Sequence, residues 1–151
     1  MVSVSELNEK GGCLDFYEAS FETPIEVPLF SMSVSAGIPI EANDTIERKV
    51  DLNELLIDHP ASTIFAKVNG KEMEDVGIKD GDVMVINTAL EPIDGRIVVA
   101  ELDGRFLVKY FRNINGEQYL ESQSRSFVPI KLINKKSYRF VGVVTKIIHS
   151  F

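Results

Sequence analysis

A lysine inside an apolar strand is the first residue of this sequence that could do chemistry. In Arg105–Phe111 (Arg-Phe-Leu-Val-Lys-Tyr-Phe), strand alternation places Lys109 on one face with Leu107 and Phe111. Such a lysine either extends its amine to the edge of the sheet or lies in a dry site. Desolvation in a dry site favours the neutral amine, which can act as a general base. The strand alone leaves both interpretations open and favours the first, because active-site lysines are rare.

A polar, glycine-rich loop over residues 68–82 is the second candidate, since loops between strands often present functional groups. The loop carries an acidic group that could suggest calcium: Glu72, Glu74, Asp75, Asp80 and Asp82. Its spacing lacks the ligand pattern of an EF-hand. We therefore interpret the group as a solvated loop.

The remaining reactive side chains do not form a metal or cofactor pattern. Cys13 is the single cysteine, which suits a reducing compartment, and we interpret it as an incidental thiol. His59 and His149 have no ligand partners at a suitable spacing. We expect no metal and no cofactor.

Composition limits the class of protein. The 151 residues, 44% of them hydrophobic and 26% charged, suit one globular domain with an attached arm. The formal net charge is -7 and the longest basic run is Lys135-Lys136, so we expect no direct binding to nucleic acid. No apolar stretch approaches the roughly 18 residues of a membrane span, and the N-terminus does not resemble a signal peptide. We expect a cytoplasmic protein without a membrane anchor.

The elements that must position Lys109 and the loop are mainly strands. Runs of strand-forming residues bounded by turn residues predict strands at the following ranges: 62–68, 83–87, 96–102, 105–111, 117–122 and 139–149. Asp103-Gly104 and Asn115-Gly116 predict hairpin turns. A capping residue at Asp51 and a stop at Pro60 predict one short helix at about 51–59.

The chain divides, on these patterns, into an N-terminal arm over residues 1–49 and a β domain over residues 50–151. The arm is irregular and contains Pro24, Pro28 and Pro39. Within it, residues 26–30 and 31–35 either pair as short strands or lie extended across another surface.

Six motifs in one order resemble the LexA/UmuD family of self-cleaving regulators, with the greatest likeness to UmuD. They span roughly Val27 to His149 and read Val27-Pro-Leu-Phe30, Ser35-Ala-Gly-Ile-Pro39, Val50-Asp-Leu-Asn-Glu-Leu-Leu-Ile-Asp-His-Pro60, Gly77-Ile-Lys-Asp-Gly-Asp82, Asp103-Gly-Arg-Phe-Leu-Val-Lys109 and Phe140-Val-Gly-Val-Val144. The resemblance implies a mainly β core of the LexA and signal-peptidase type, with the short helix and the extended arm. Residues 1–26 are not covered by it.

The resemblance also implies a serine/lysine dyad that cuts the chain's own arm. A serine in a Gly-x-Ser-Met loop attacks an Ala-Gly or Cys-Gly bond, and a lysine on a later strand takes its proton. By this likeness Lys109 occupies the general base position, and Ala36-Gly37 is the cleavage-site pair.

The nucleophile position departs from the family pattern, because Gly70-Lys-Glu-Met73 places Glu72 where the serine belongs. A carboxylate is a poor nucleophile toward an amide, so we expect cleavage to fail. We further expect Glu72 to form an ion pair with Lys109 across a shared cleft, since opposite charges stabilise each other. Glu72 is either a natural substitution or an engineered one that traps the uncleaved form of an active peptidase.

The function implied by the resemblance is that of a UmuD-like protein of the SOS response to DNA damage. Such a protein is a homodimer and an accessory subunit of a translesion DNA polymerase, and it contacts the RecA filament. The residues before Ala36 have no helix-turn-helix pattern, which favours this reading over a repressor. The alternatives are an active self-cleaving serine peptidase and a repressor C-terminal dimerisation domain.

Overall fold

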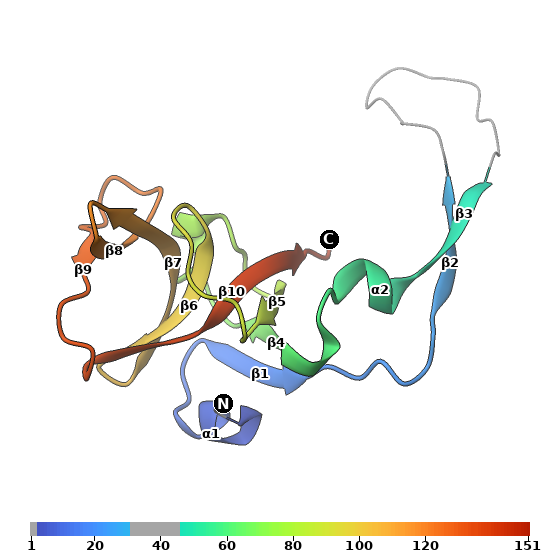
Figure 1. Ribbon diagram of the computed structural model, residues 1–151, viewed down its shortest axis with the longest axis horizontal. Helices are drawn as coiled ribbons and strands as arrows, with labels where there is room; N and C mark the ends of the chain where they lie inside the picture. Colours follow the sequence, from blue (N-terminus) through green and yellow to red (C-terminus); the bar gives the residue numbers. More distant parts are fainter. Residues whose placement is uncertain (1–2, 31–45) are drawn as a thin grey trace, which may run out of the picture. The chain divides into compact units, whose positions relative to one another are not determined.

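The computed structural model describes residues 3–30 and 46–151 (Figure 1). These residues form two compact units. The larger unit contains the described residues up to Ala19 together with His59–Phe151, and the smaller unit contains those of Ser20–Asp58. No helix among the described residues is long and apolar enough to cross a bilayer.

The larger unit is built on one antiparallel sheet of eight strands, which confirms the mainly β fold class. The strand order across the sheet is β1-β4-β5-β10-β6-β7-β8-β9. The strands are β1 (Leu14–Glu18), β4 (Thr63–Val68), β5 (Val83–Asn87), β6 (Ile97–Leu102), β7 (Arg105–Ile114), β8 (Glu117–Glu121), β9 (Ile130–Lys131) and β10 (Tyr138–Ile148). Its helical elements are α1 (Val4–Glu9) and two short 3-10 turns, η1 (Pro60–Ser62) and η2 (Glu74–Val76).

Both predicted hairpin turns are present and join β6 to β7 and β7 to β8. Asp103 and Asn115 have φ angles of 48° and 52°, and the glycines that follow them have φ angles of 80° and 83°. Two successive positive φ angles match the twist of antiparallel strands, which is why Asp-Gly and Asn-Gly are favoured there.

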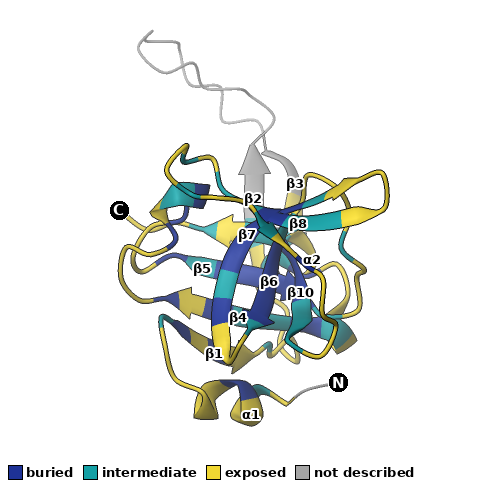
Figure 2. Ribbon diagram, turned by 90° about the vertical axis from the view of Figure 1, so that its left-hand side faces the viewer, coloured by how far each residue is buried: buried dark blue, intermediate teal, exposed yellow. Residues whose placement is uncertain are grey.

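The hydrophobic core lies on both faces of the sheet, and β7 contributes to each. Phe106 and Val108 belong to one buried cluster, whereas Leu107 and Phe111 belong to the other. Figure 2 shows the buried stretches of β6 and β7 side by side in the middle of the molecule. The predicted alternation is therefore observed, and it places Lys109 on the face of Leu107 and Phe111.

The N-terminal residues belong to the larger unit, so the compact units do not coincide with the expected division at residue 49. Helix α1 begins at a capping box between Ser3 and Glu6. Leu7 is 1% exposed and packs in the core, and β1 pairs with β4 in a register that opposes Leu14 to Val68. The Asn8 side chain accepts a hydrogen bond from the backbone N–H of Phe16 and donates one to its carbonyl.

The smaller unit contains a two-stranded ribbon and a short helix. Strand β2 (Glu26–Phe30) pairs antiparallel with β3 (Ile46–Asp51), so the first range expected to be extended is a strand. Helix α2 (Leu52–Leu56) begins at Asp51, whose side chain accepts from the Asn53 N–H, and it is shorter than predicted. The range 31–35 and the pair Ala36-Gly37 lie outside the described residues.

Candidate functional site

Lys109 lies in a dry site on β7 and does not extend to the edge of the sheet. Its side chain is 6% exposed, and its strand neighbour across the ladder is Val98 on β6. The Nζ atom forms an ion pair with Asp75 and lies 4.4 Å from the centre of the Phe127 ring. A carboxylate and an aromatic face both attract an ammonium group, so these two contacts hold the Lys109 side chain in place.

Asp75 reaches Lys109 because η2 is anchored on both sides by apolar residues. Met73 and Val76 are buried in the core, and Gly77 closes the turn with a φ angle of 83°. The Asp75 carbonyl also accepts hydrogen bonds of 3.3 Å from Ser122 Oγ and the Gln123 N–H. The loop that follows β8 therefore also holds Asp75 in place.

The two oxygens of Asp75 differ in their surroundings. The Oδ2 atom contacts Lys109, whereas the buried Oδ1 atom has no hydrogen-bond partner among residues 3–30 and 46–151. A buried acceptor without a donor costs about 1–3 kcal/mol. The position of Asp75 is thus fixed by the packing of η2 and of the loop after β8, and not by hydrogen bonds to both of its carboxylate oxygens.

Glu72 does not form the expected ion pair with Lys109, and that prediction was wrong. In the described part of the chain, the carboxylate that pairs with Lys109 belongs to Asp75. Glu72 precedes η2 and is exposed, whereas the next residue, Met73, is buried in the core. The turn that follows Met73 carries Asp75, which contacts Lys109 on β7. Glu72 and Lys109 lie in the expected loop and strand, but their charged groups do not form an ion pair.

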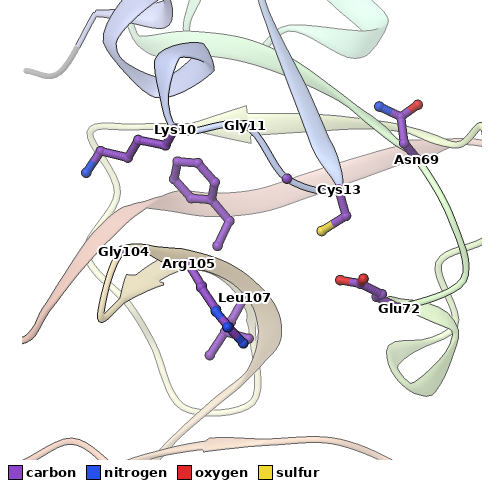
Figure 3. Close-up of a pocket in the computed structure, with 10 residues that line it drawn as sticks. Lys10, Gly11, Cys13, Asn69, Glu72, Gly104, Arg105 and Leu107 are labelled. Carbon is purple, nitrogen blue, oxygen red and sulfur yellow. The ribbon is translucent and has the colours of Figure 1, made fainter.

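Glu72 instead faces Cys13 across a hollow of about 510 Å³ beside β7 (Figure 3). The hollow is also lined by Lys10, Arg105 and Leu107. Burial raises the pKa of the Cys13 thiol, and a hydrogen bond to the Glu72 carboxylate and its negative charge raise it further. The thiol is therefore held in its protonated form at neutral pH.

Sequence reasoning missed Asp75, Phe127 and the contact between Cys13 and Glu72. A signal for Asp75 exists, because it stands between Met73 and Val76, and apolar residues three apart predict a helical turn with one buried side. Phe127 and Cys13 offer no comparable local signal, since both reach the site from segments that are distant in the sequence.

Comparison with known proteins identifies the family. The pattern of the Peptidase S24-like family matches residues 28–145. The chain belongs to this family. Protein ImpA of Salmonella typhimurium is 37% identical over 122 residues, which cover 81% of this chain and 83% of ImpA. The LexA repressor of Colwellia psychrerythraea is 34% identical over 118 residues, which cover 78% of this chain and 56% of the repressor. Protein MucA of Salmonella typhimurium is 36% identical over 97 residues, covering 64% of this chain and 66% of MucA.

Membership of the Peptidase S24-like family confirms the resemblance to the LexA/UmuD group of self-cleaving proteins. The matched region begins at Pro28 and ends in β10, so it leaves α1, β1 and Cys13 outside. In the hollow shown in Figure 3, the wall formed by Lys10 and Cys13 therefore lies outside the matched residues.

Proposed function

We propose that this chain is a UmuD-like protein of the SOS response that does not cleave itself. One observation carries the proposal: the exposed Glu72 stands at the position that the family likeness assigns to the serine, while Lys109 is paired with Asp75. A carboxylate that attacked an amide would be expelled again from the adduct, since the amide nitrogen is the poorer leaving group. Lys109 keeps the position of the general base, and Ala36-Gly37 keeps that of the cleaved pair.

Self-cleavage after Ala36 gives a direct test, because the fragment masses are fixed by the sequence. We expect the unchanged chain, with Glu72, to stay intact at alkaline pH, where lysine amines lose their protons. The Glu72→Ser variant should cleave after Ala36, and the added change Lys109→Ala should abolish that cleavage. Intact mass spectrometry over a time course measures all three chains.

Two results would overturn the proposal. Cleavage of the unchanged chain would mean that a residue other than Glu72 is the nucleophile, and it would favour the alternative of an active peptidase. Cleavage of the Glu72→Ser/Lys109→Ala variant at an equal rate would remove Lys109 from the base position. A Glu72→Gln chain provides the matched control, since it changes the same side chain without supplying a hydroxyl group.

The partners follow from the same proposal. We infer a homodimer that serves as accessory subunit of a translesion DNA polymerase and contacts the RecA filament. Co-purification of the tagged chain with candidate polymerases, and its retention on RecA assembled on single-stranded DNA, test these contacts. Sedimentation that yields a dimer without polymerase binding would instead favour a dimerisation domain of the repressor type.

A further inference from the structure

A second hollow, of about 490 Å³, lies at the tip of the β6–β7 hairpin. It shares Lys10 and Gly104 with the first hollow, but neither Glu72 nor Lys109 lines it. Its lining gathers charged side chains from three segments that are distant in sequence. These are the cations Lys10, Lys135, Lys136 and Arg139 and the carboxylates Glu101 and Asp103. Four cations in one concave place are unusual for a chain whose formal net charge is -7.

Glu101 organises one side of this hollow. It is 8% exposed, and its two oxygens form ion pairs with Lys10 and Arg139. Burial raises the pKa of Glu101, but the hydrogen bonds from the two cations outweigh it and leave the pKa below the usual range. One negative charge is thus shared by two positive charges, so the trio keeps an excess of positive charge.

Lys135 and Lys136 form the other side, on a turn that is fixed by backbone hydrogen bonds. The Ser137 N–H donates to the Asn134 carbonyl at 2.9 Å, and the Lys136 N–H donates to Asn134 Oδ1 at 3.0 Å. The turn is also tied to the hairpin, because the Asp103 N–H donates to the Ser137 carbonyl at 3.0 Å. Both lysines are exposed, and within residues 3–30 and 46–151 neither takes part in an ion pair.

The hollow suits an anion, and its features favour carboxylates over a nucleic acid backbone. A negatively charged molecule repels a long polyphosphate at a distance, whereas a local concave patch still attracts a compact anion. Tyr138 is the one aromatic residue of the lining, and its ring makes an edge-to-face contact with Phe140 at 5.7 Å. The hollow therefore lacks the succession of aromatic rings on which the bases of a single strand stack.

We propose that this hollow binds an acidic peptide segment of a partner protein, whose carboxylates contact Lys135, Lys136 and Arg139. Its volume is that of an ordinary ligand site and accommodates a few side chains. Lysine and arginine donate charge-assisted hydrogen bonds to carboxylates, and two such bonds account for an affinity change of about tenfold or more. The proposal uses neither Glu72 nor Lys109, so it holds whether or not the chain cleaves itself.

Fluorescence anisotropy tests the proposal with a short labelled peptide in which Glu and Asp alternate with Gly and Ser. The Lys135→Glu/Lys136→Glu variant should bind this peptide at least about tenfold more weakly, and Lys135→Gln/Lys136→Gln should fall between it and the unchanged chain. The matched control is Lys49→Glu/Lys67→Glu, which makes the same charge change at exposed residues outside the hollow and should alter binding by less than about twofold. Circular dichroism verifies that each variant is folded.

Three outcomes would overturn the proposal. The acidic peptide could fail to bind the unchanged chain, or it could lose the same affinity in the control as in the hollow variant. An oligothymidylate of matching length could also bind more tightly than the peptide and lose that binding in the hollow variant. That last result would assign the hollow to nucleic acid.

Discussion

The charge of Lys109 is balanced by a residue three positions beyond the one that the sequence suggested. Asp75 and Lys109 form a largely buried pair, and the exposed fractions of their side chains are 21% and 6%. Such a pair contributes little net stability relative to an apolar pair, yet removal of one partner leaves a buried charge uncompensated. The contribution of the pair to stability is therefore best measured by removing one of its partners.

We expect Asp75→Asn to lower the free energy of unfolding by about 2 kcal/mol, because it leaves the Lys109 ammonium without a counter-charge. Urea denaturation measures the change. Glu74→Gln is the matched control, since it removes the same charge from the exposed neighbouring residue of η2 and should change stability by less than about 0.5 kcal/mol. Equal effects of both substitutions would contradict the importance of the pair.

Cys13 offers a second residue-scale test, which depends on pH. Since Glu72 adds to the burial that raises the pKa of the thiol, Glu72→Gln should lower that pKa and increase the thiolate fraction at mildly alkaline pH. Alkylation by iodoacetamide should therefore be faster in the variant, and its pH profile should move to lower pH. Intact mass follows the reaction without ambiguity, because Cys13 is the single cysteine. An unchanged profile would mean that Glu72 does not act on the thiol.

At the scale of elements, helix α1 is held to the sheet by a single buried anchor. Leu7 is the one buried residue of the helix, and its neighbours in the core include Leu14 and Phe16 of β1. A six-residue helix is too short to be stable alone, so its stability comes from this contact, from Val4, which also packs on the core, from the Asn8 hydrogen bonds to Phe16 and from its capping box.

Leu7→Ala should therefore lower the free energy of unfolding by about 3 kcal/mol, as is typical when a buried leucine is truncated. Leu90→Ala is the matched control, because Leu90 belongs to the same unit and is 38% exposed. Thermal or urea denaturation compares the two variants. A smaller loss for Leu7→Ala than for Leu90→Ala would indicate that α1 does not pack on the core.

The elements that could be predicted from sequence are those with strong local signals. The strand 83–87 has the predicted bounds, and the hairpins at Asp103-Gly104 and Asn115-Gly116 follow from the backbone preferences of those residues. Strand β1 was missed because Leu14–Glu18 is short and its pairing with β4 is a distant contact. Helix α1 was missed for a related reason, since its six residues place only Val4 and Leu7 against the core, and two apolar residues make a weak periodic pattern.

The site was predicted to the level of its elements but not of its contacts. Lys109 and the loop that contains Glu72 were identified by type, spacing and family likeness. Which acidic residue reaches the lysine depends on how Met73 and Val76 pack, and packing of that kind is set by the whole core. The same holds for Phe127, whose ring covers Lys109 from a loop without regular structure.

For the molecule as a whole, a buried carboxylate connects stability to pH. Asp82 is 2% exposed, its Oδ2 accepts from the Lys79 N–H at 2.8 Å, and its Oδ1 contacts His149 near the C-terminus. Burial raises the pKa of Asp82, but the hydrogen bond with His149 and that from Lys79 outweigh it, so the pKa lies below its ordinary value. A carboxyl group with a depressed pKa stabilises the fold above its unfolded-state pKa.

This stabilisation is lost as the pH falls through the depressed pKa of Asp82, because the unfolded chain then binds a proton more readily. We expect Asp82→Asn to be about 2 kcal/mol less stable at neutral pH and to lose less stability than the unchanged chain between neutral and acidic pH. Urea midpoints over a pH series measure both effects, with the exposed Glu91→Gln as control. Parallel curves for the unchanged chain and Asp82→Asn would refute the linkage.

The N-terminal segment also affects whether a strand of another copy can pair with the sheet. Strand β1 is one border of the eight-stranded sheet, and a border strand presents backbone N–H and C=O groups to which a strand of another chain can pair. The amide of Asn8 occupies both backbone groups of Phe16 and so closes this border to a passing strand at its centre. A strand of another copy would therefore find the central backbone groups of β1 already occupied.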